Sequence, residues 1–135
     1  MRYAPYAQEV AATADMSETL LLEYFLTRVF ETEEVWGLDD GCEWITVERD
    51  HQSVMPIWPY RQYAAEACDG EWSAHQPAAE SLEDFVYNTL GTLIEEDIML
   101  EVMSGAGVGG CLIAPQRLYE IFTGMFSAGE YTLDS

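Results

Sequence analysis

The fold of this chain is decided by the stretch Val54-Met-Pro-Ile-Trp-Pro-Tyr-Arg-Gln-Tyr-Ala-Ala65. Its first half predicts an apolar strand, and the second of its two prolines opens a short helix. Pro56 has no N–H to donate to a strand ladder, which predicts that this strand lies at a sheet edge or bulges there. Trp58 and Tyr60 form an apolar junction, against which we expect the neighbouring elements to pack.

Two periodic patterns precede this junction. Apolar residues recur at i, i+3 and i+4 over 21–30, which predicts an amphipathic helix that begins at a capping box, Asp15–Glu18. Residues 33–38 and 42–49 flank the turn sequence Asp39-Asp40-Gly41. Together with the strand of the junction they predict a three-stranded antiparallel meander.

Helical and strand patterns alternate after the junction. In order we expect a weak strand over 71–76, a connector at Pro77-Ala78-Ala79, a helix from a box at Ser81–Asp84 to about residue 94, strands over 98–103 and 111–114, and a last helix from Pro115. This order predicts an α+β fold with one mainly antiparallel sheet of about five or six strands and helices packed on one face. We expect residues 1–135 to form a single domain, in which 1–14 show no sustained period and are interpreted as an N-terminal arm.

The charge of the chain is unusual. Five arginines, no lysine and 25 acidic residues leave a formal net charge of −20. Such a surface repels phosphate backbones and anionic lipids, so we expect neither nucleic-acid nor membrane binding. A basic protein is the complementary partner. The alternative is that the acidity serves solubility alone, and it stays open at this stage.

The three cysteines, Cys42, Cys68 and Cys111, are odd in number and form no C-x-x-C pair. This favours reduced thiols over a disulfide framework or a zinc site. The N-terminal residues carry no apolar signal segment, and a cytoplasmic location is expected.

Gly105-Ala-Gly107-Val-Gly-Gly110 satisfies G-x-G-x-x-G. A dinucleotide fingerprint must open a helix, whereas this loop is followed by Cys-Leu-Ile-Ala-Pro, which predicts a strand. We therefore interpret it as a flexible hairpin loop that can fold over a ligand or partner.

No residue pattern nominates a catalytic or metal site. His51 and His75 stand alone, and the clustered carboxylates lack EF-hand spacing, so no metal and no cofactor are expected. The tryptophans are expected to pack in the core and at its rim; they are Trp36, Trp44, Trp58 and Trp72. If two of them are exposed together, a binding face is the better interpretation. The arginines are expected to pair with carboxylates, with Arg61 partly buried; the others are Arg28, Arg49 and Arg117.

Several spaced blocks of sequence resemble a bacterial family of small proteins, the domain-of-unknown-function family two-seven-five-zero. The blocks are Tyr24-Phe-Leu-Thr-Arg-Val-Phe, Glu34-Val-Trp-Gly-Leu, Pro56-Ile-Trp-Pro-Tyr-Arg-Gln-Tyr-Ala, Gly70-Glu-Trp and Ser81-Leu-Glu-Asp-Phe, within Thr19–Phe122. The resemblance implies a cytosolic bacterial domain and brings no catalytic residues with it.

Three hypotheses for function follow. The leading one is a non-enzymatic acidic interaction module that binds or regulates a basic protein partner. The first alternative is a small-ligand binding domain with a pocket between the junction and the glycine loop, and its site residues are Trp58, Tyr60, Arg61, Gly105, Gly107 and Gly110. The second alternative is an unrecognised enzyme that uses clustered carboxylates. The oligomeric state is not predicted.

Overall fold

Twelve helical and strand elements make up the described part of the computed structural model, which covers residues 8, 12–13, 16–41, 43–49, 51–68, 75–104 and 110–127. The elements in chain order are α2 (Glu18–Thr32), β1 (Glu34–Asp39), β2 (Val47–Arg49), β3 (Gln52–Ile57), α3 (Arg61–Ala67), β4 (Gln76–Ser81), α4 (Leu82–Asp84), the π-helix η2 (Phe85–Thr89), α5 (Leu90–Glu96), β5 (Met99–Val102), β6 (Cys111–Ile113) and α6 (Pro115–Ser127). Of the expected strand over 71–76, only residues 75 and 76 are described. Of the expected arm over 1–14, only residues 8, 12 and 13 are described.

Helix α2 confirms the first periodic pattern. Leu21, Phe25 and Val29 are buried along one stripe. Its N-cap is Ser17, whose hydroxyl accepts a hydrogen bond from the Leu20 amide at 3.2 Å, so the helix begins after Ser17 and the expected cap at Asp15 is wrong. Glu33 ends the helix in the left-handed conformation, with φ 61°.

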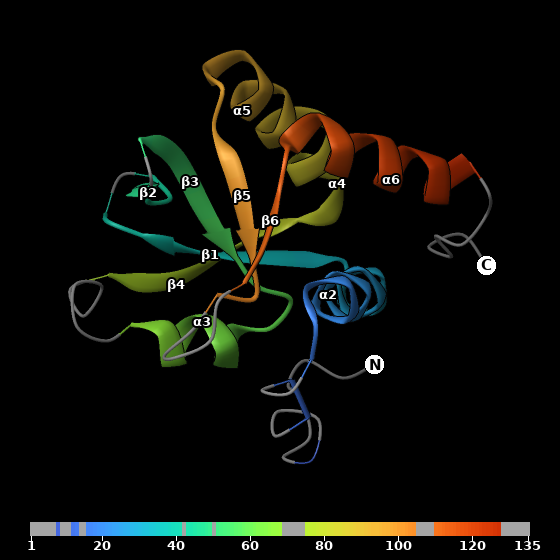
Figure 1. Ribbon diagram of the computed structural model, residues 1–135, viewed down its shortest axis with the longest axis horizontal. Coiled ribbons are helices and arrows are strands. Elements are labelled where there is room, and N and C mark those ends of the chain that lie inside the picture. The colour runs from blue at the N-terminus through green and yellow to red at the C-terminus, as the bar shows by residue number, and fades with distance from the viewer. Residues whose placement is uncertain are drawn as a thin grey trace.

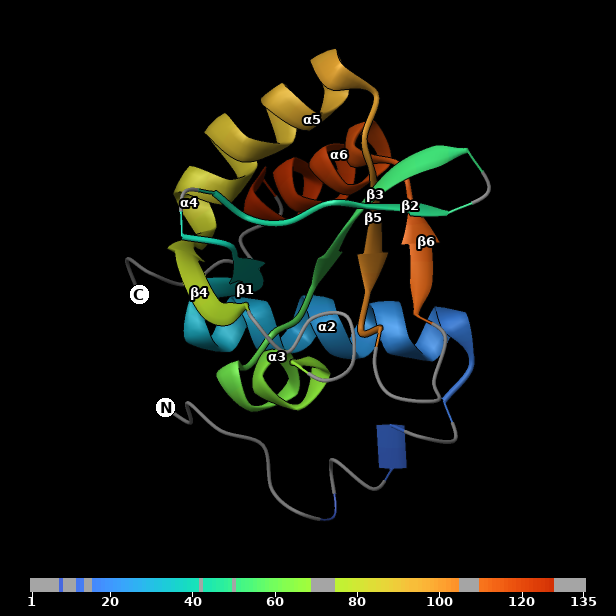
Figure 2. The same cartoon turned by 90° about the vertical axis from the view of Figure 1, so that its left-hand side faces the viewer.

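The strands form two sheets (Figures 1 and 2). β1 and β4 make an antiparallel pair, and the other sheet has the order β2-β3-β5-β6. Within that sheet β3 and β5 are parallel, whereas the other two pairs are antiparallel. The α+β class is confirmed, but the strands are divided between two sheets where one was expected. The long crossover from β3 to β5, which contains α3, β4 and the helices after it, permits the parallel pairing.

The expected three-stranded meander is confirmed only for its second hairpin. β2 pairs with β3, but β1 pairs with β4 along its whole length, from Glu34 opposite Ser81 to Asp39 opposite Gln76. The expected connector Pro77-Ala78-Ala79 is therefore part of a strand, because β1 supplies a partner for it that the sequence pattern does not reveal. The expected edge position of this strand is wrong, because β3 lies between β2 and β5. Pro56 lies beyond Val54, the last residue of β3 that pairs with β2, so its missing N–H costs that ladder nothing.

Trp58 joins the two sheets. It exchanges two backbone hydrogen bonds with Trp36 of β1, each at 2.8 Å, directly after β3 ends. Its side chain is 1% exposed, and its indole Nε1 donates to the Ser104 carbonyl oxygen at 2.5 Å. Tyr60 is also 1% exposed. The junction predicted from the sequence is thus a core element.

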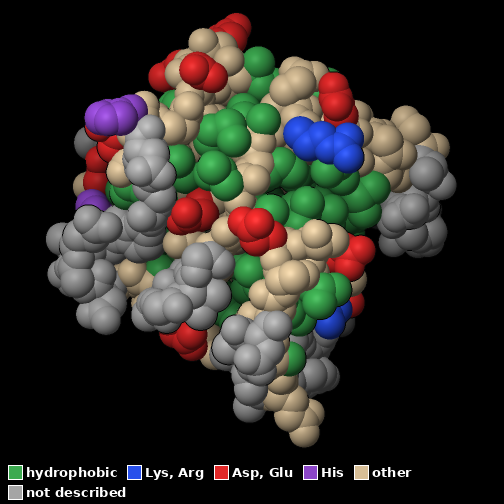
Figure 3. Space-filling model, in the orientation of Figure 1, with side chains coloured by type: hydrophobic (Ala, Val, Ile, Leu, Met, Phe, Trp, Pro, Cys, Tyr) green, Lys and Arg blue, Asp and Glu red, His purple; other side chains and the backbone are tan. Residues whose placement is uncertain are grey.

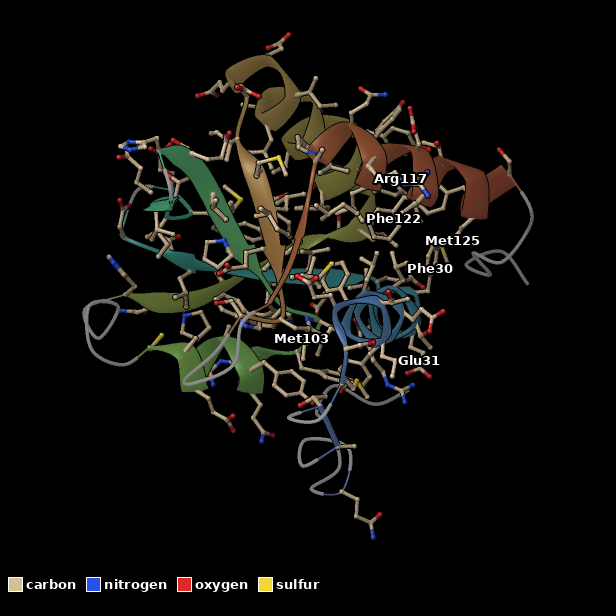
Figure 4. All side chains as sticks on the ribbon, viewed as in Figure 1. Phe30, Glu31, Met103, Arg117, Phe122 and Met125 are labelled. Atoms are coloured by element: carbon tan, nitrogen blue, oxygen red, sulfur yellow. The ribbon has the colours of Figure 1, made fainter. Side chains whose placement is uncertain are left out.

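The helices occupy two positions around the strands. In Figure 1, α2 and α6 lie on the same side of the four-stranded sheet, and Figure 2 shows both behind it. Figure 4 shows Phe30 of α2 and Phe122 of α6 between these helices, and their ring centroids are 5.6 Å apart. Helix α3 packs instead against β1 and β4. Within the described ranges, no helix combines the length and the apolar composition that crossing a bilayer requires.

The helix expected over 82–94 is present, but its middle is a π-helix. Ser81 caps it by accepting a hydrogen bond from the Asp84 amide at 3.2 Å. The π-helix η2 follows α4, and α5 continues to Glu96, where Asp97 ends the run with φ 57°. A π-turn holds one more residue than an α-turn, which rotates the residues after it relative to an ideal helix.

We expect the substitution Trp58→Phe to lower the free energy of unfolding by about 2–4 kcal/mol, because it removes buried volume and leaves the Ser104 carbonyl without its indole donor. Urea unfolding measures the change. The control is Trp36→Phe, whose half-buried ring should cost less than about 1.5 kcal/mol. Equal losses in the two variants would contradict the role given to Trp58.

Candidate functional site

A cleft of about 640 Å³ opens between β1, β4, the 43–46 loop and the helical segment formed by η2 and α5. Its apolar wall is formed by the side chains of Trp44, Met55, Ala78, Ala79, Leu93 and Ile98. Its neutral polar groups are Thr46, Asn88, Thr89 and Thr92, and its carboxylates are Asp39, Glu43, Glu80 and Glu96. The volume is that of a typical ligand site.

Trp44 is held in the cleft wall by its contacts with β1 and η2. A Cβ atom placed on Gly37 would lie 2.6 Å from Cδ2 and Cε3 of the indole, so the ring lies directly on the Gly37 backbone. The Trp44 and Phe85 ring centroids are 6.3 Å apart. The indole is half-buried, which leaves part of it open to the cleft.

The loop before Trp44 is held by hydrogen bonds from its own backbone. The Asp39 carboxylate accepts from the Gly41 amide at 2.6 Å, and the Asp40 carboxylate accepts from the Glu43 amide at 3.1 Å. Asp39 also forms an antiparallel bridge with Trp44. These bonds give both aspartates a structural role, and Asp39 also lines the cleft.

The π-helix brings a second wall to the same cleft. The Thr89 hydroxyl donates to the Glu80 carboxylate at 2.5 Å, which ties η2 to β4. The Thr92 hydroxyl donates to the Asn88 carbonyl at 3.3 Å. Both threonines keep oxygen lone pairs that can accept a hydrogen bond from a donor in the cleft.

The cleft is acidic throughout. Four carboxylates line it, and its lining includes no lysine, arginine or histidine. Glu43 and Glu96 are exposed, whereas Asp39 and Glu80 are half-buried. Figure 3 shows one face of the molecule, on which acidic side chains lie at many points around and between the hydrophobic areas and basic side chains at few. The arrangement suits a cationic group that also carries apolar surface.

The described residues present no cluster of three metal-ligating side chains and no thiol with a lowered pKa. Among the described residues, no three His, Cys, Asp or Glu side chains converge as ligands for a metal ion. Cys68 and Cys111 are free thiols, and Cys68 donates to the Ala64 carbonyl at 3.4 Å. Burial raises the pKa of Cys68 against the opposing effect of Arg61, and burial together with Glu18 raises the pKa of Cys111. Both thiols are therefore protonated at neutral pH, which makes them weak nucleophiles.

The site residues expected from the sequence do not form this cleft. Trp58 and Tyr60 are core residues, and Gly105 and Gly107 lie outside the described residues. Gly110 is required by close packing, since a Cβ atom there would collide with the Val102 carbonyl oxygen. A pocket between Trp58 and the glycine loop remains a prediction.

The arginines behave differently from one another. Arg28 pairs with Glu31 at 3.0 Å and lies over the Tyr24 ring, as expected for a structural ion pair. Arg61 is exposed, so its expected partial burial is wrong, because α3 turns its first residue toward solvent. Arg117 is also exposed, and neither of these two forms an ion pair with another described residue. The Arg49 side chain is outside the described part.

The prediction that the tryptophans pack in the core and at its rim is confirmed for those that the structure describes. Trp36 and Trp44 are half-buried rim residues, and Trp72 lies outside the described ranges. His51 sits in a turn with φ 67°, and it is exposed. Sequence reasoning missed the cleft itself, because its walls come from β1, β4 and η2, which are separated along the chain.

Comparison with known proteins yields one match. The family model described as "Protein of unknown function (DUF2750)" covers residues 22–121, a range that contains every residue lining the cleft. No curated protein and no solved structure matches the chain.

We expect Gly37→Ala to lower the free energy of unfolding by about 1–3 kcal/mol, because the new methyl group would overlap the Trp44 ring. Thermal or urea unfolding tests this. Gly124→Ala is the matched control, since no atom lies within 4 Å of its added Cβ. The helix propensity of alanine should leave that variant unchanged or more stable by up to about 1 kcal/mol. A neutral Gly37→Ala variant would argue against the tight packing.

Cys68 and Cys111 should react with iodoacetamide more slowly than free cysteine at neutral pH, because their raised pKa values reduce the thiolate fraction. The rate should increase as the pH rises through and above the ordinary thiol pKa. Peptide mapping by mass spectrometry separates these two positions from Cys42. Rapid labelling of either thiol at neutral pH would instead indicate an activated nucleophile.

Proposed function

We propose that this chain, which belongs to the DUF2750 family, is a non-catalytic binding module that recognises a basic protein partner. The family description itself assigns no activity. The observation that carries this proposal is the cleft, in which four carboxylates surround an apolar wall and no basic side chain takes part.

Electrostatics supports a basic partner over other macromolecules. The net charge of −20 gives the whole surface a negative potential, which attracts cations and speeds their encounter with the cleft. The same potential opposes nucleic acids and anionic lipids. The apolar wall adds a hydrophobic contribution to the binding free energy, because a side chain that fills the cleft also removes apolar surface from water.

The arrangement favours binding over proton transfer. Glu43 and Glu96 are exposed to solvent, whereas carboxylates that act as general acids are usually desolvated. Glu80 already accepts a hydrogen bond from Thr89. The two free thiols in the described ranges have raised pKa values and do not line the cleft, so neither supplies it with an activated nucleophile.

The test is affinity capture from the lysate of the native organism at low and high salt, with three baits. One bait is the wild-type chain, and the second is the cleft variant E43Q/E80Q/E96Q. The third is a control variant, E23Q/E66Q/E83Q, whose exposed positions lie on α2, α3 and α4 outside the cleft lining. Each variant loses three of the 25 acidic groups, so both change the net charge from −20 to −17.

We expect a basic protein that is retained by the wild type and the control, is lost from the cleft variant, and is released as salt screens the charges. Retention of the same proteins by all three baits would show that the cleft plays no part. The absence of any retained protein at low salt would contradict the proposal as a whole.

A further inference from the structure

Two smaller hollows beside the cleft share lining residues with it. A hollow of about 280 Å³ shares Asp39 and Ala78 with the cleft and extends along the start of β4 to Gln76. Another hollow, of about 390 Å³, shares Glu43 and Trp44 with the cleft and extends to His75. We call these three hollows, which share lining residues, the acidic groove.

The segment between β1 and β2 contributes lining residues to all three hollows. Asp40 lines both of the smaller ones. Neither of them is lined by lysine or arginine. Trp44 lines two of the three hollows and provides an aromatic surface where they meet.

Small residues border the groove on the side of β4. Pro77 and Ala78 line the 280 Å³ hollow opposite Gly41, and Ala78 and Ala79 line the cleft. Short side chains leave room for a peptide backbone to come close, whereas the flat face of a folded protein could not follow a groove around a loop. The carboxylates are spread along this path, so each can meet a different side chain of one extended chain.

We propose that the acidic groove binds an extended, arginine-containing segment of the basic partner, with one guanidinium lying on the Trp44 indole. This inference rests on the proposed function and states the form in which the partner is recognised. A guanidinium stacks on an aromatic face and forms planar, bidentate pairs with carboxylates. Glu43 and Glu80 line the same cleft as the indole, and Thr46 and Thr92 add neutral acceptors there.

A metal ion and a folded basic surface are the competing occupants. Chelation requires ligands that converge, and among the described residues no such group of three exists. A folded basic surface would meet only the groove rim, and it would gain little from Trp44. The main cost of binding an unfolded segment is the conformational entropy that it loses when it becomes ordered. Burial of its apolar side-chain surface on the cleft wall offsets part of that cost.

The test compares three probes at about 0.15 M salt, where exposed charges are screened beyond about 8 Å. The probes are a short oligo-arginine peptide, an oligo-citrulline peptide of the same length, which is nearly isosteric and uncharged, and lysozyme as a folded basic protein. Each is titrated by calorimetry into the wild type, E43Q/E80Q/E96Q and E23Q/E66Q/E83Q. NMR follows the indole N–H signal of Trp44, which the substitution Trp44→Phe assigns.

We expect the oligo-arginine peptide to bind the wild type and the control with similar affinity and the cleft variant about tenfold more weakly, since three partly exposed ion pairs are lost. The Trp44 indole signal should shift with the arginine peptide and stay in place with the citrulline peptide. Equal weakening in the two variants, or an unchanged Trp44 signal, would overturn the groove as the binding site.

The two proposals fail in different ways. If lysozyme binds through the cleft carboxylates and the arginine peptide does not, the extended segment is wrong, whereas recognition of a basic protein stands. If no probe binds and the captures also retain nothing, both proposals are wrong. A third outcome is that the wild type retains the native partner and the cleft variant loses it, but no arginine-containing segment of that partner competes with the peptide. In that case only the inference about the segment is overturned.

Discussion

The contact between Trp36 and Trp58 is the constraint on which the rest of the structure depends. Two backbone hydrogen bonds of 2.8 Å link the two-stranded sheet to the end of β3, and no other strand pairing connects the two sheets in the described part of the chain. The buried indole of Trp58 then reaches the Ser104 carbonyl at the end of the β5 segment. Trp58 therefore fixes β1 against β3, and its indole adds a bond to the segment after β5, which already pairs with β3. Burial makes these bonds strong because water does not compete for them.

The cleft follows from this arrangement of the sheets. Because β1 belongs to a different sheet from β3, the chain between β1 and β2 must bridge the two, and it does so through the loop that ends in Trp44. Gly37 allows the indole to lie on β1, and the π-helix η2 brings Thr89 to Glu80 of β4. The Trp44 ring and the carboxylates of Asp39 and Glu80 are therefore held by backbone packing and by structural hydrogen bonds, which preorganises this part of the site for a ligand.

Local sequence patterns predicted where helices and strands occur much better than they predicted which strands pair. The stripe of Leu21, Phe25 and Val29 identified α2, since a helix buries one face at a period of 3.6 residues. The strand at Pro77-Ala78-Ala79 was missed, because proline and alanine have low strand propensity and only the pairing with β1 makes them a strand. The candidate site was missed for the same reason, since Glu80, Thr89 and Trp44 meet only after β1 and β4 pair.

The sequence by itself determined the α+β class, the burial of the Trp58 junction and the strong negative charge, because periodicity, aromatic content and composition act locally or add up over the whole chain. Only the tertiary structure decided which strands pair, that there are two sheets, and that the carboxylates of β1, β4 and α5 line one cleft with Trp44. Strand pairing between distant segments depends on the packing of both faces at once, and no single segment of the sequence carries that information.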